Sequence, residues 1–132
     1  MANKEPKYIL TENADIEEKI ILLQRKPSPE ALAVALTAVR RQMKRGGQLV
    51  VAVDASMQLQ TVEVEGKPWI PAFTSFDEEM KGDARVMSTF TADMRKLFEL
   101  ALASSDAEGI VLNPWNKTLM LSRHLIEIVL GK

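Results

Sequence analysis

The chain has 132 residues, of which 46% are hydrophobic and 27% charged, a composition typical of one globular domain and not of a disordered chain. Seventeen Lys and Arg side chains face eighteen Asp and Glu, so the net charge of -1 provides no global attraction to nucleic acid or to an anionic membrane. The absence of cysteine excludes disulfides, thiolate nucleophiles and cysteine-bound metal centres.

The N-terminal residues are polar and lack periodicity, so we expect a loose arm over 1–14 and a single domain over 15–132. No apolar run resembles a signal peptide, and none reaches the roughly 18 residues that a membrane-spanning helix requires. We therefore expect a soluble, cytoplasmic protein that does not bind membranes.

Two helices are expected at the start of the domain. The first begins at Asp15, which has capping-box spacing to Glu18, and ends before Pro27 because proline has no amide hydrogen. The second begins after Ser28, a favourable N-cap, with Pro29 at its first position, and ends at a pair of glycines. The apolar stripe of this second helix consists of Leu32, Ala35, Leu36, Val39 and Met43.

Four basic side chains gather in the last turns of the second helix: Arg40, Arg41, Lys44 and Arg45. Cations at a helix C-terminus complement the negative end of the helix dipole, and this interpretation requires no ligand. The alternative is a weak anion patch that contacts phosphate or nucleic acid. We favour the first interpretation because no RNA-recognition motif and no interleaved aromatic residues accompany these side chains.

Three strands are expected next. Residues 48–54 form a short, almost continuous apolar run, which is typical of a strand buried on both faces. Alternation at 62–64 and a second run at 69–74, separated by a turn, predict a β-hairpin. Pro68 and Pro71 cannot donate to a ladder, so the second strand of the hairpin is expected at a sheet edge or with a bulge.

A short helix, a strand and a longer helix follow. Ser75 and Glu78 have capping-box spacing and predict a short helix over 76–81. A strand is expected over 86–90, after which Thr91 caps the longer helix. The inner face of that helix is expected to contain Met94, Leu97, Phe98, Ala101 and Leu102.

The C-terminal part is expected to contain two strands and a helix. The apolar strand 110–112 ends at an Asn-Pro pair, which favours a turn, and another strand follows at 118–121. Ser122 caps a last helix that ends at Gly131. The inner face of this helix is expected to contain Leu125, Ile128 and Val129. Hairpins together with helix-separated strands predict an α/β (α+β) domain with one mixed sheet of about five strands packed by helices.

Two motifs resemble the N-terminal domain of the SseB family, named for enhanced serine sensitivity. The first is a strand that ends in Pro-x-Phe-Thr-Ser before an acidic helix, and the second is an apolar strand that ends in Asn-Pro. The matching residues are Pro71, Phe73, Thr74 and Ser75, and then 109–114. The resemblance in order and spacing covers roughly residues 28–130. Trp115 departs from the pattern, and the chain ends before the second domain of longer members, so we expect functions of that domain to be missing.

The resemblance implies a small α/β domain and supplies no catalytic residue. The sole histidine, His124, has no identifiable nucleophile beside it, and one histidine cannot form a His-rich metal site. The acidic residues at 77–79 are explained by the start of a helix. We therefore expect no metal and no cofactor, and we favour a protein without enzymatic activity.

Both motifs leave the carboxyl ends of expected strands. If those strands are parallel neighbours, the motifs lie side by side and form a partner or ligand surface, because open α/β sheets tend to bind ligands at strand ends. Its residues are Phe73, Thr74, Ser75, Asn113, Pro114 and Trp115. Simpler structural roles also stay open, since Ser75 can cap a helix and Asn113 can brace a turn.

The sequence thus leaves three functions open. The favoured hypothesis is a non-enzymatic, cytoplasmic interaction or regulatory module that uses the two-motif edge or an exposed helix face to bind an unknown protein partner or a second copy of itself. The alternative is a small-ligand-binding domain or an enzyme with a pocket near Thr74, Ser75 and Asn113, with His124 as a further participant. The third is contact with phosphate or nucleic acid through the basic turn of the second helix.

Overall fold

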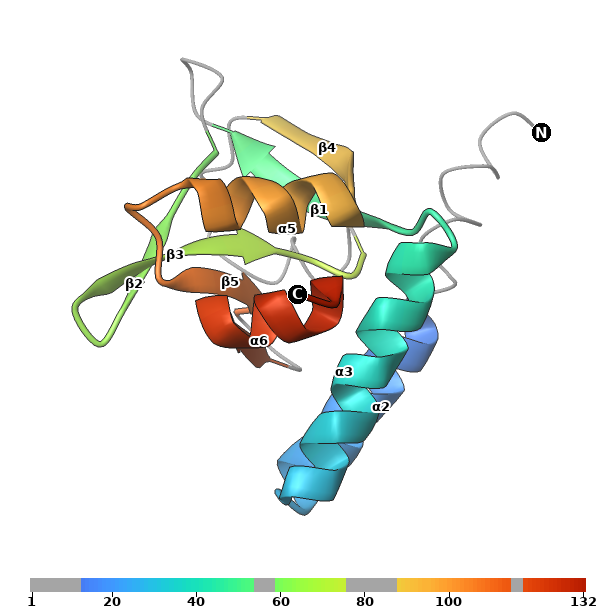
Figure 1. Cartoon of the computed structure of the whole chain (residues 1–132). Coiled ribbons are helices and arrows are strands. Elements are labelled where there is room, and N and C mark those ends of the chain that lie inside the picture. The colour runs from blue at the N-terminus through green and yellow to red at the C-terminus, as the bar shows by residue number, and fades with distance from the viewer. Residues whose placement is uncertain (1–12, 54–58, 76–87, 115–117) are drawn as a thin grey trace.

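The chain folds into four helices and six strands within the parts that the computed structural model describes, residues 13–53, 59–75, 88–114 and 118–132 (Figure 1). In chain order they are α2 (Ala14–Arg25), α3 (Pro29–Lys44), β1 (Gln48–Val53), β2 (Val62–Val64), β3 (Lys67–Ala72), β4 (Ser88–Asp93), α5 (Met94–Ala103), β5 (Gly109–Leu112), β6 (Leu119–Ser122) and α6 (Arg123–Leu130). The arrangement is an α+β fold, as the sequence predicts. The helix expected over 76–81 lies outside the described residues.

The strands form two sheets, where the sequence predicts one. A four-stranded mixed sheet has the order β2-β3-β5-β6, in which β3 and β5 are parallel and the other neighbours are antiparallel. A second sheet consists of the antiparallel pair β1 and β4. The two sheets meet at Phe73, just after β3, which exchanges backbone hydrogen bonds of 2.8 and 2.9 Å with Val50 of β1. This bridge places β1 beside the end of β3, but it is a single residue pair and does not join the two sheets into one.

β3 lies inside the four-stranded sheet, so the expectation of an edge or bulged strand is wrong. Its ladder with β2 ends at Trp69, and its ladder with β5 begins at Ile70. The carbonyl of Ala72 faces β5 and the amide of Phe73 faces β1. Because backbone groups alternate sides along a strand, the amide position of Pro71 faces the interval between β2 and β1. The described ladders require no donor there, which explains why an interior strand accepts a proline.

Two of the four described helices begin at the caps that the sequence predicts. Ser28 accepts from a backbone amide of α3 at 3.0 Å, and Ser122 accepts from one of α6 at 3.3 Å. The prediction of Thr91 as a cap is wrong because β4 continues through Asp93, whose side chain caps α5. The prediction of Asp15 as a cap is also wrong, since this residue lies in the first turn of α2.

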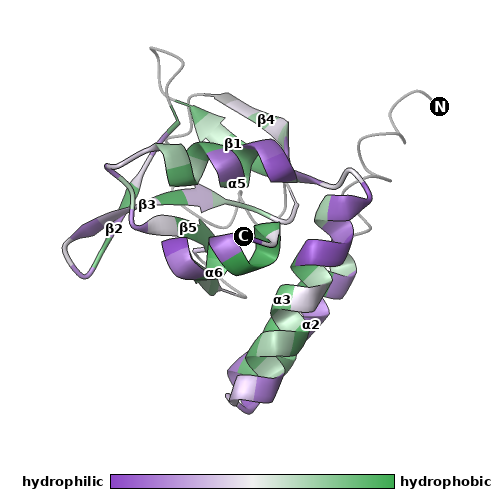
Figure 2. Ribbon diagram, viewed as in Figure 1, coloured by the Kyte–Doolittle hydropathy of each residue, from purple (hydrophilic) through white to green (hydrophobic). Residues whose placement is uncertain are grey.

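One hydrophobic core joins the helices to both sheets. α5 and α6 lie on the same side of the sheets, and the hairpin of α2 and α3 stands beside them, with α3 in contact with α5 and α6 (Figure 1). α3 is hydrophobic along its middle and hydrophilic at its ends (Figure 2). In α6, Ile126 and Val129 are buried, whereas Ile128, expected inside, is exposed. Ile128 lies about 200° around the helix from Ile126, on the opposite face.

Arg123, at the first position of α6, ties this helix to the end of α5. Its guanidinium donates to the carbonyls of Ala101, Ser104 and Ala107 at 3.0, 2.7 and 3.2 Å, and also to the carbonyl of Leu102. The last carbonyls of a helix have no partner within the helix, and the bonds to Ala101 and Leu102 satisfy two of them in α5. The side chain therefore fixes the connection that leads from α5 into β5.

Candidate functional site

A polar junction lies at the carboxyl ends of β3 and β5. Because these strands are parallel neighbours, the Phe73–Ser75 and Asn113–Pro114 motifs lie side by side, the arrangement that the sequence hypothesis requires. The Thr74 amide donates to Asn113 Oδ1 at 2.9 Å, and Asn113 Nδ2 donates to Thr74 Oγ1 at 3.1 Å. Asn113 has a φ of 51°, in the left-handed region that asparagine adopts more readily than most residues.

α2 completes this junction. Asn13, the N-cap residue of α2, donates through Nδ2 to the carbonyls of Gln48 at 2.8 Å and Thr74 at 3.1 Å. The Thr74 hydroxyl in turn donates to the carboxylate of Glu17, one turn into α2. Asn13 Oδ1 is buried and has no hydrogen-bond partner among the described residues. Asn13 and Glu17, which the sequence did not identify as site residues, thus hold α2 against the strand ends.

The residues of the partner or ligand surface expected from the sequence are placed as follows. Phe73, Thr74 and Asn113 are buried, whereas Ser75 and Pro114 are half-buried. Trp115 lies outside the described residues. His124, expected as a further participant in a ligand site, is exposed on α6. The hydrogen bonds described above occupy Thr74 and Asn113 within the chain, and the partner or ligand surface at these residues stays a prediction.

Asp15 forms one ion pair within α2 and one that joins α2 to α3. Its carboxylate lies 2.9 Å from Lys19 Nζ and 3.5 Å from Arg41 Nη1. The hydrogen bonds of Lys19 to Asp15 and then to Glu18 raise the pKa of Lys19. The resulting stabilisation is present below the ordinary pKa of 10.5 and is lost as pH rises through the raised value.

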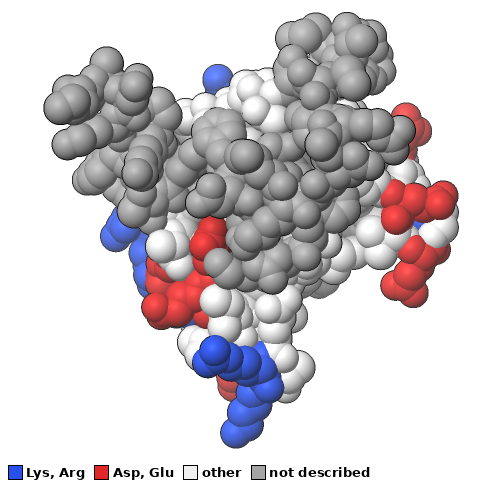
Figure 3. Space-filling view, turned by 180° about the vertical axis from the view of Figure 1, so that it is seen from behind, with Lys and Arg blue, Asp and Glu red and all other residues white. Residues whose placement is uncertain are grey.

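The four basic residues at the end of α3 are all exposed. Besides Arg41, which faces Asp15, Arg45 has a partner within the chain and donates to Gln42 Oε1 at 3.3 Å. On the face seen in Figure 3, the acidic and basic side chains of described residues form small separate groups. The partners of Arg41 and Arg45 fit the helix-end interpretation of these cations, and the anion patch stays a prediction.

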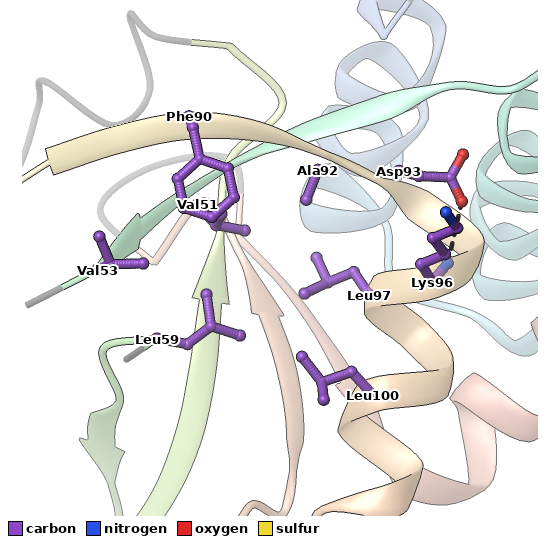
Figure 4. Close-up of a pocket in the computed structure, with 9 residues that line it drawn as sticks. All are labelled: Val51, Val53, Leu59, Phe90, Ala92, Asp93, Lys96, Leu97 and Leu100. Atoms are coloured by element: carbon purple, nitrogen blue, oxygen red, sulfur yellow. Dashed lines mark hydrogen bonds between the residues drawn. The ribbon is translucent and has the colours of Figure 1, made fainter. Parts of the chain in front are cut away.

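An apolar groove of about 270 Å³ opens between the β1–β4 sheet and α5 (Figure 4). Its buried lining comprises Val51 and Val53 of β1 and Leu97 of α5, with the half-buried Leu59 and Ala92 beside them. Phe90 of β4 and Leu100 of α5 also line it and are 43% and 50% exposed. The sequence did not indicate this groove, because Leu100 falls outside the expected inner face of its helix.

The charged side chains that line the groove, Asp93 and Lys96, stand at one end of it (Figure 4). Asp93 Oδ2 accepts from the backbone amide of Lys96 at 3.1 Å as the cap of α5. Among the ion pairs of the described residues, none includes the Lys96 ammonium. The groove therefore offers apolar contact along its length and one cation at its end.

These features define an α+β domain with a closed polar junction at its strand ends and an open apolar groove beside α5. A family model described as the SseB protein N-terminal domain matches residues 23–127, most of the 132-residue chain, and the chain therefore belongs to the SseB family. This match confirms the resemblance seen in the sequence. No curated protein and no solved structure shows significant similarity to the chain. Within the described residues, no helix is both long and apolar enough to cross a membrane.

Proposed function

We propose that this SseB-family chain is a non-enzymatic interaction module of the cytoplasm, which binds a partner protein by receiving apolar side chains in the groove between β4 and α5. The observation that carries the proposal is the exposure of Phe90 and Leu100 on a groove whose deeper lining is buried. Single exposed apolar residues are common on proteins, but contiguous apolar surface marks an interaction site.

The lining supports binding and not chemical catalysis. Asp93 and Lys96 are its ionisable residues, and Asp93 already serves as a helix cap. Covalent and acid–base catalysis require a nucleophile with an adjacent base or a suitable pair of titratable groups, and the described residues of this lining supply neither. Its volume of about 270 Å³ also lies below the roughly 300–1,000 Å³ of typical small-molecule sites. A side chain of a partner suits the groove better than a whole small ligand.

The groove belongs to the part of the chain that defines the family. Its lining residues, between 51 and 100, fall inside the matched range 23–127. Asn13 and Glu17, which hold α2 on the strand ends, precede that range. The proposed interaction therefore uses a feature of the family domain itself, whereas the contacts of Asn13 and Glu17 are additions to it.

A comparison of two matched variants tests the proposal. Leu100→Asp places a charge beside the groove, and Leu22→Asp does the same on α2, where Leu22 is 49% exposed and also lies in the last turn of its helix. Wild type and both variants would serve as baits in quantitative affinity capture from native lysate. We expect Leu100→Asp to lose a partner that Leu22→Asp keeps. Identical partner sets for all three baits would contradict the proposal.

A further inference from the structure

We propose that the partner enters as an extended segment that adds a strand to the outer edge of β4, with an apolar side chain in the groove and an acidic side chain beside Lys96. This inference rests on the proposed function and specifies the chemistry of its partner. One buried apolar side chain contributes only about 1.5–3 kcal/mol, and association has large entropic costs. The contacts that surround the groove therefore decide which occupant fits.

The backbone of β4 presents hydrogen-bonding groups along its outer edge. β4 pairs with β1 in a continuous antiparallel register from Gln48–Asp93 to Val53–Ser88. The amide and carbonyl of Val50 point away from β4 and bond to Phe73. The amide of Met94, just after β4, donates to the carbonyl of Gly47, just before β1. Because these groups alternate along a strand, Thr89, Thr91 and Asp93 turn theirs to the outer edge.

Within the described residues, the outer edge of β4 carries no lysine, no proline and no bulge. Among the described strands, β1 is the one that pairs with β4. Edge strands commonly carry lysine, proline or a bulge that blocks pairing with another chain. The sequence of β4, Ser-Thr-Phe-Thr-Ala-Asp, contains neither lysine nor proline, and its register with β1 is regular. Such an edge suits the addition of an extended peptide, whose main chain supplies affinity and whose alternate side chains supply specificity.

The groove lies where the alternate side chains of an added strand would point. Phe90 and Ala92 both line it, so this face of β4 is the one that faces α5 (Figure 4). Side chains of paired strands at the same level point to the same face. An apolar residue of the added strand beside Phe90 would therefore enter the groove next to Leu100.

Lys96 provides charge complementarity for the next side chain on that face. It stands at the end of the groove toward which β4 runs, and Asp93 is occupied by its cap bond. Residues on one face of a strand are two positions apart, roughly 6.6–6.8 Å. For an added segment that runs parallel to β4, the favoured partner sequence is therefore an apolar residue, any residue, and an acidic residue, in that order.

An NMR titration of the full chain with a synthetic peptide, Thr-Thr-Thr-Leu-Thr-Asp-Thr-Thr, tests this inference. We expect the amide signals of Thr89, Thr91 and Asp93 to shift and their hydrogen exchange to slow. Lysine in place of the peptide aspartate should weaken binding about two- to fivefold, the range of an exposed ion pair. Equal affinity for both peptides would contradict the proposed contact between Lys96 and the acidic residue of the peptide.

Two substitutions separate strand addition from other uses of the groove. Thr91→Pro removes an outward amide at an edge position where proline is tolerated, and it should weaken peptide binding about three- to tenfold. Thr91→Val keeps the amide and should leave the affinity unchanged, and thermal unfolding of both variants controls for folding. Equal affinity of these two variants would overturn strand addition.

The same titration separates this inference from the proposed function. Shifts confined to the side chains of Leu97 and Leu100, without the edge amides, would overturn strand addition in favour of another occupant, such as a helix, and leave the groove as a binding site. Shifts of the edge amides on concentration of the free chain would identify a second copy as the occupant and would also overturn the inference. No response to the peptide, with partner capture still sensitive to Leu100→Asp, would overturn strand addition alone.

Discussion

The junction at the ends of β3 and β5 and the groove beside α5 differ in how their side chains are used. In the junction, Thr74 and Asn113 bond to each other, and Thr74 also bonds to Asn13 and Glu17 of α2. In the groove, Phe90 and Leu100 keep about half of their surface in solvent. The polar residues that suggest a site in the sequence are thus occupied within the chain, and apolar residues that attract no notice remain accessible.

This difference has a physical cause. A buried amide or hydroxyl without a partner costs about 1–3 kcal/mol, so most polar groups at buried strand ends are paired. An exposed apolar side chain has no such requirement and loses only the free energy that burial would provide. The paired polar side chains of the junction therefore indicate how the strands and α2 are held together. The exposed apolar side chains of the groove indicate a surface to which a partner can bind.

The largest expected effect is that of Gly109→Ala, which would break the closed junction by moving β5. A Cβ atom at this position would lie 2.1 Å from the Leu121 carbonyl oxygen of β6, so β5 and Asn113 would have to shift. We expect the free energy of unfolding in urea to fall by about 4 kcal/mol or more. Gly66→Ala is the control, because its added Cβ meets nothing within 4 Å and its φ of 80° alone costs about 1–2 kcal/mol. Equal losses in the two variants would contradict the close β5–β6 contact.

Asn113→Ala should have the next largest effect, because it opens the junction without moving a strand. It removes the acceptor of the buried Thr74 amide and places alanine at a φ of 51°, with an expected loss of about 2–4 kcal/mol. Asn113→Gly separates the two causes, since glycine adopts this φ but restores no hydrogen bond. If both variants lose equal stability, the hydrogen bonds account for the effect. Wild-type stability in the alanine variant would contradict the closed junction.

Asn13→Ala should have a smaller effect, and one confined to α2. The substitution removes two donated hydrogen bonds but also the buried, unpaired Oδ1, so the net loss should be about 1 kcal/mol. Hydrogen exchange should become faster in α2 and stay unchanged in α5. Faster exchange in both helices would show that the junction and the groove are not independent.

Most helices and strands could be predicted because their signals are local. Ser28 and Ser122 cap helices within three residues of themselves, and the apolar run of β1 indicates its burial directly. The place of β3 could not be predicted, since the fit of Pro71 depends on which strands lie beside it. The same limit applies to Asn13, whose bond to Thr74 spans 61 residues. The sequence contains no signal for this partner, because the two residues lie far apart in the chain.

The candidate site could be predicted only in part, for a related reason. The parallel pairing of β3 and β5, which the hypothesis required, brings Thr74 and Asn113 together. Thr74 also forms hydrogen bonds to Asn13 and Glu17, which come from a distant part of the chain. The groove depends on how α5 lies across the β1–β4 sheet, so it follows from packing and not from a motif. Exposed apolar residues such as Leu100 become informative only after the buried lining beside them is known.

The smallest expected effect on stability is that of Leu100→Asp, and it tests whether the groove is open in the free protein. Leu100 and Leu22 are 50% and 49% exposed, each in the last turn of its helix, so the two aspartate variants carry the same cost at the helix dipole. If Leu100 has no further contacts in solution, both variants should change the unfolding free energy by less than about 1 kcal/mol and by equal amounts. A much larger loss in Leu100→Asp, measured by urea denaturation, would mean that the leucine is buried in solution and that the groove is closed. Equal small losses would instead mean that the fold of Leu100→Asp is unchanged. A partner that no longer binds this variant would then be lost because the binding surface has changed, and not because the protein has unfolded.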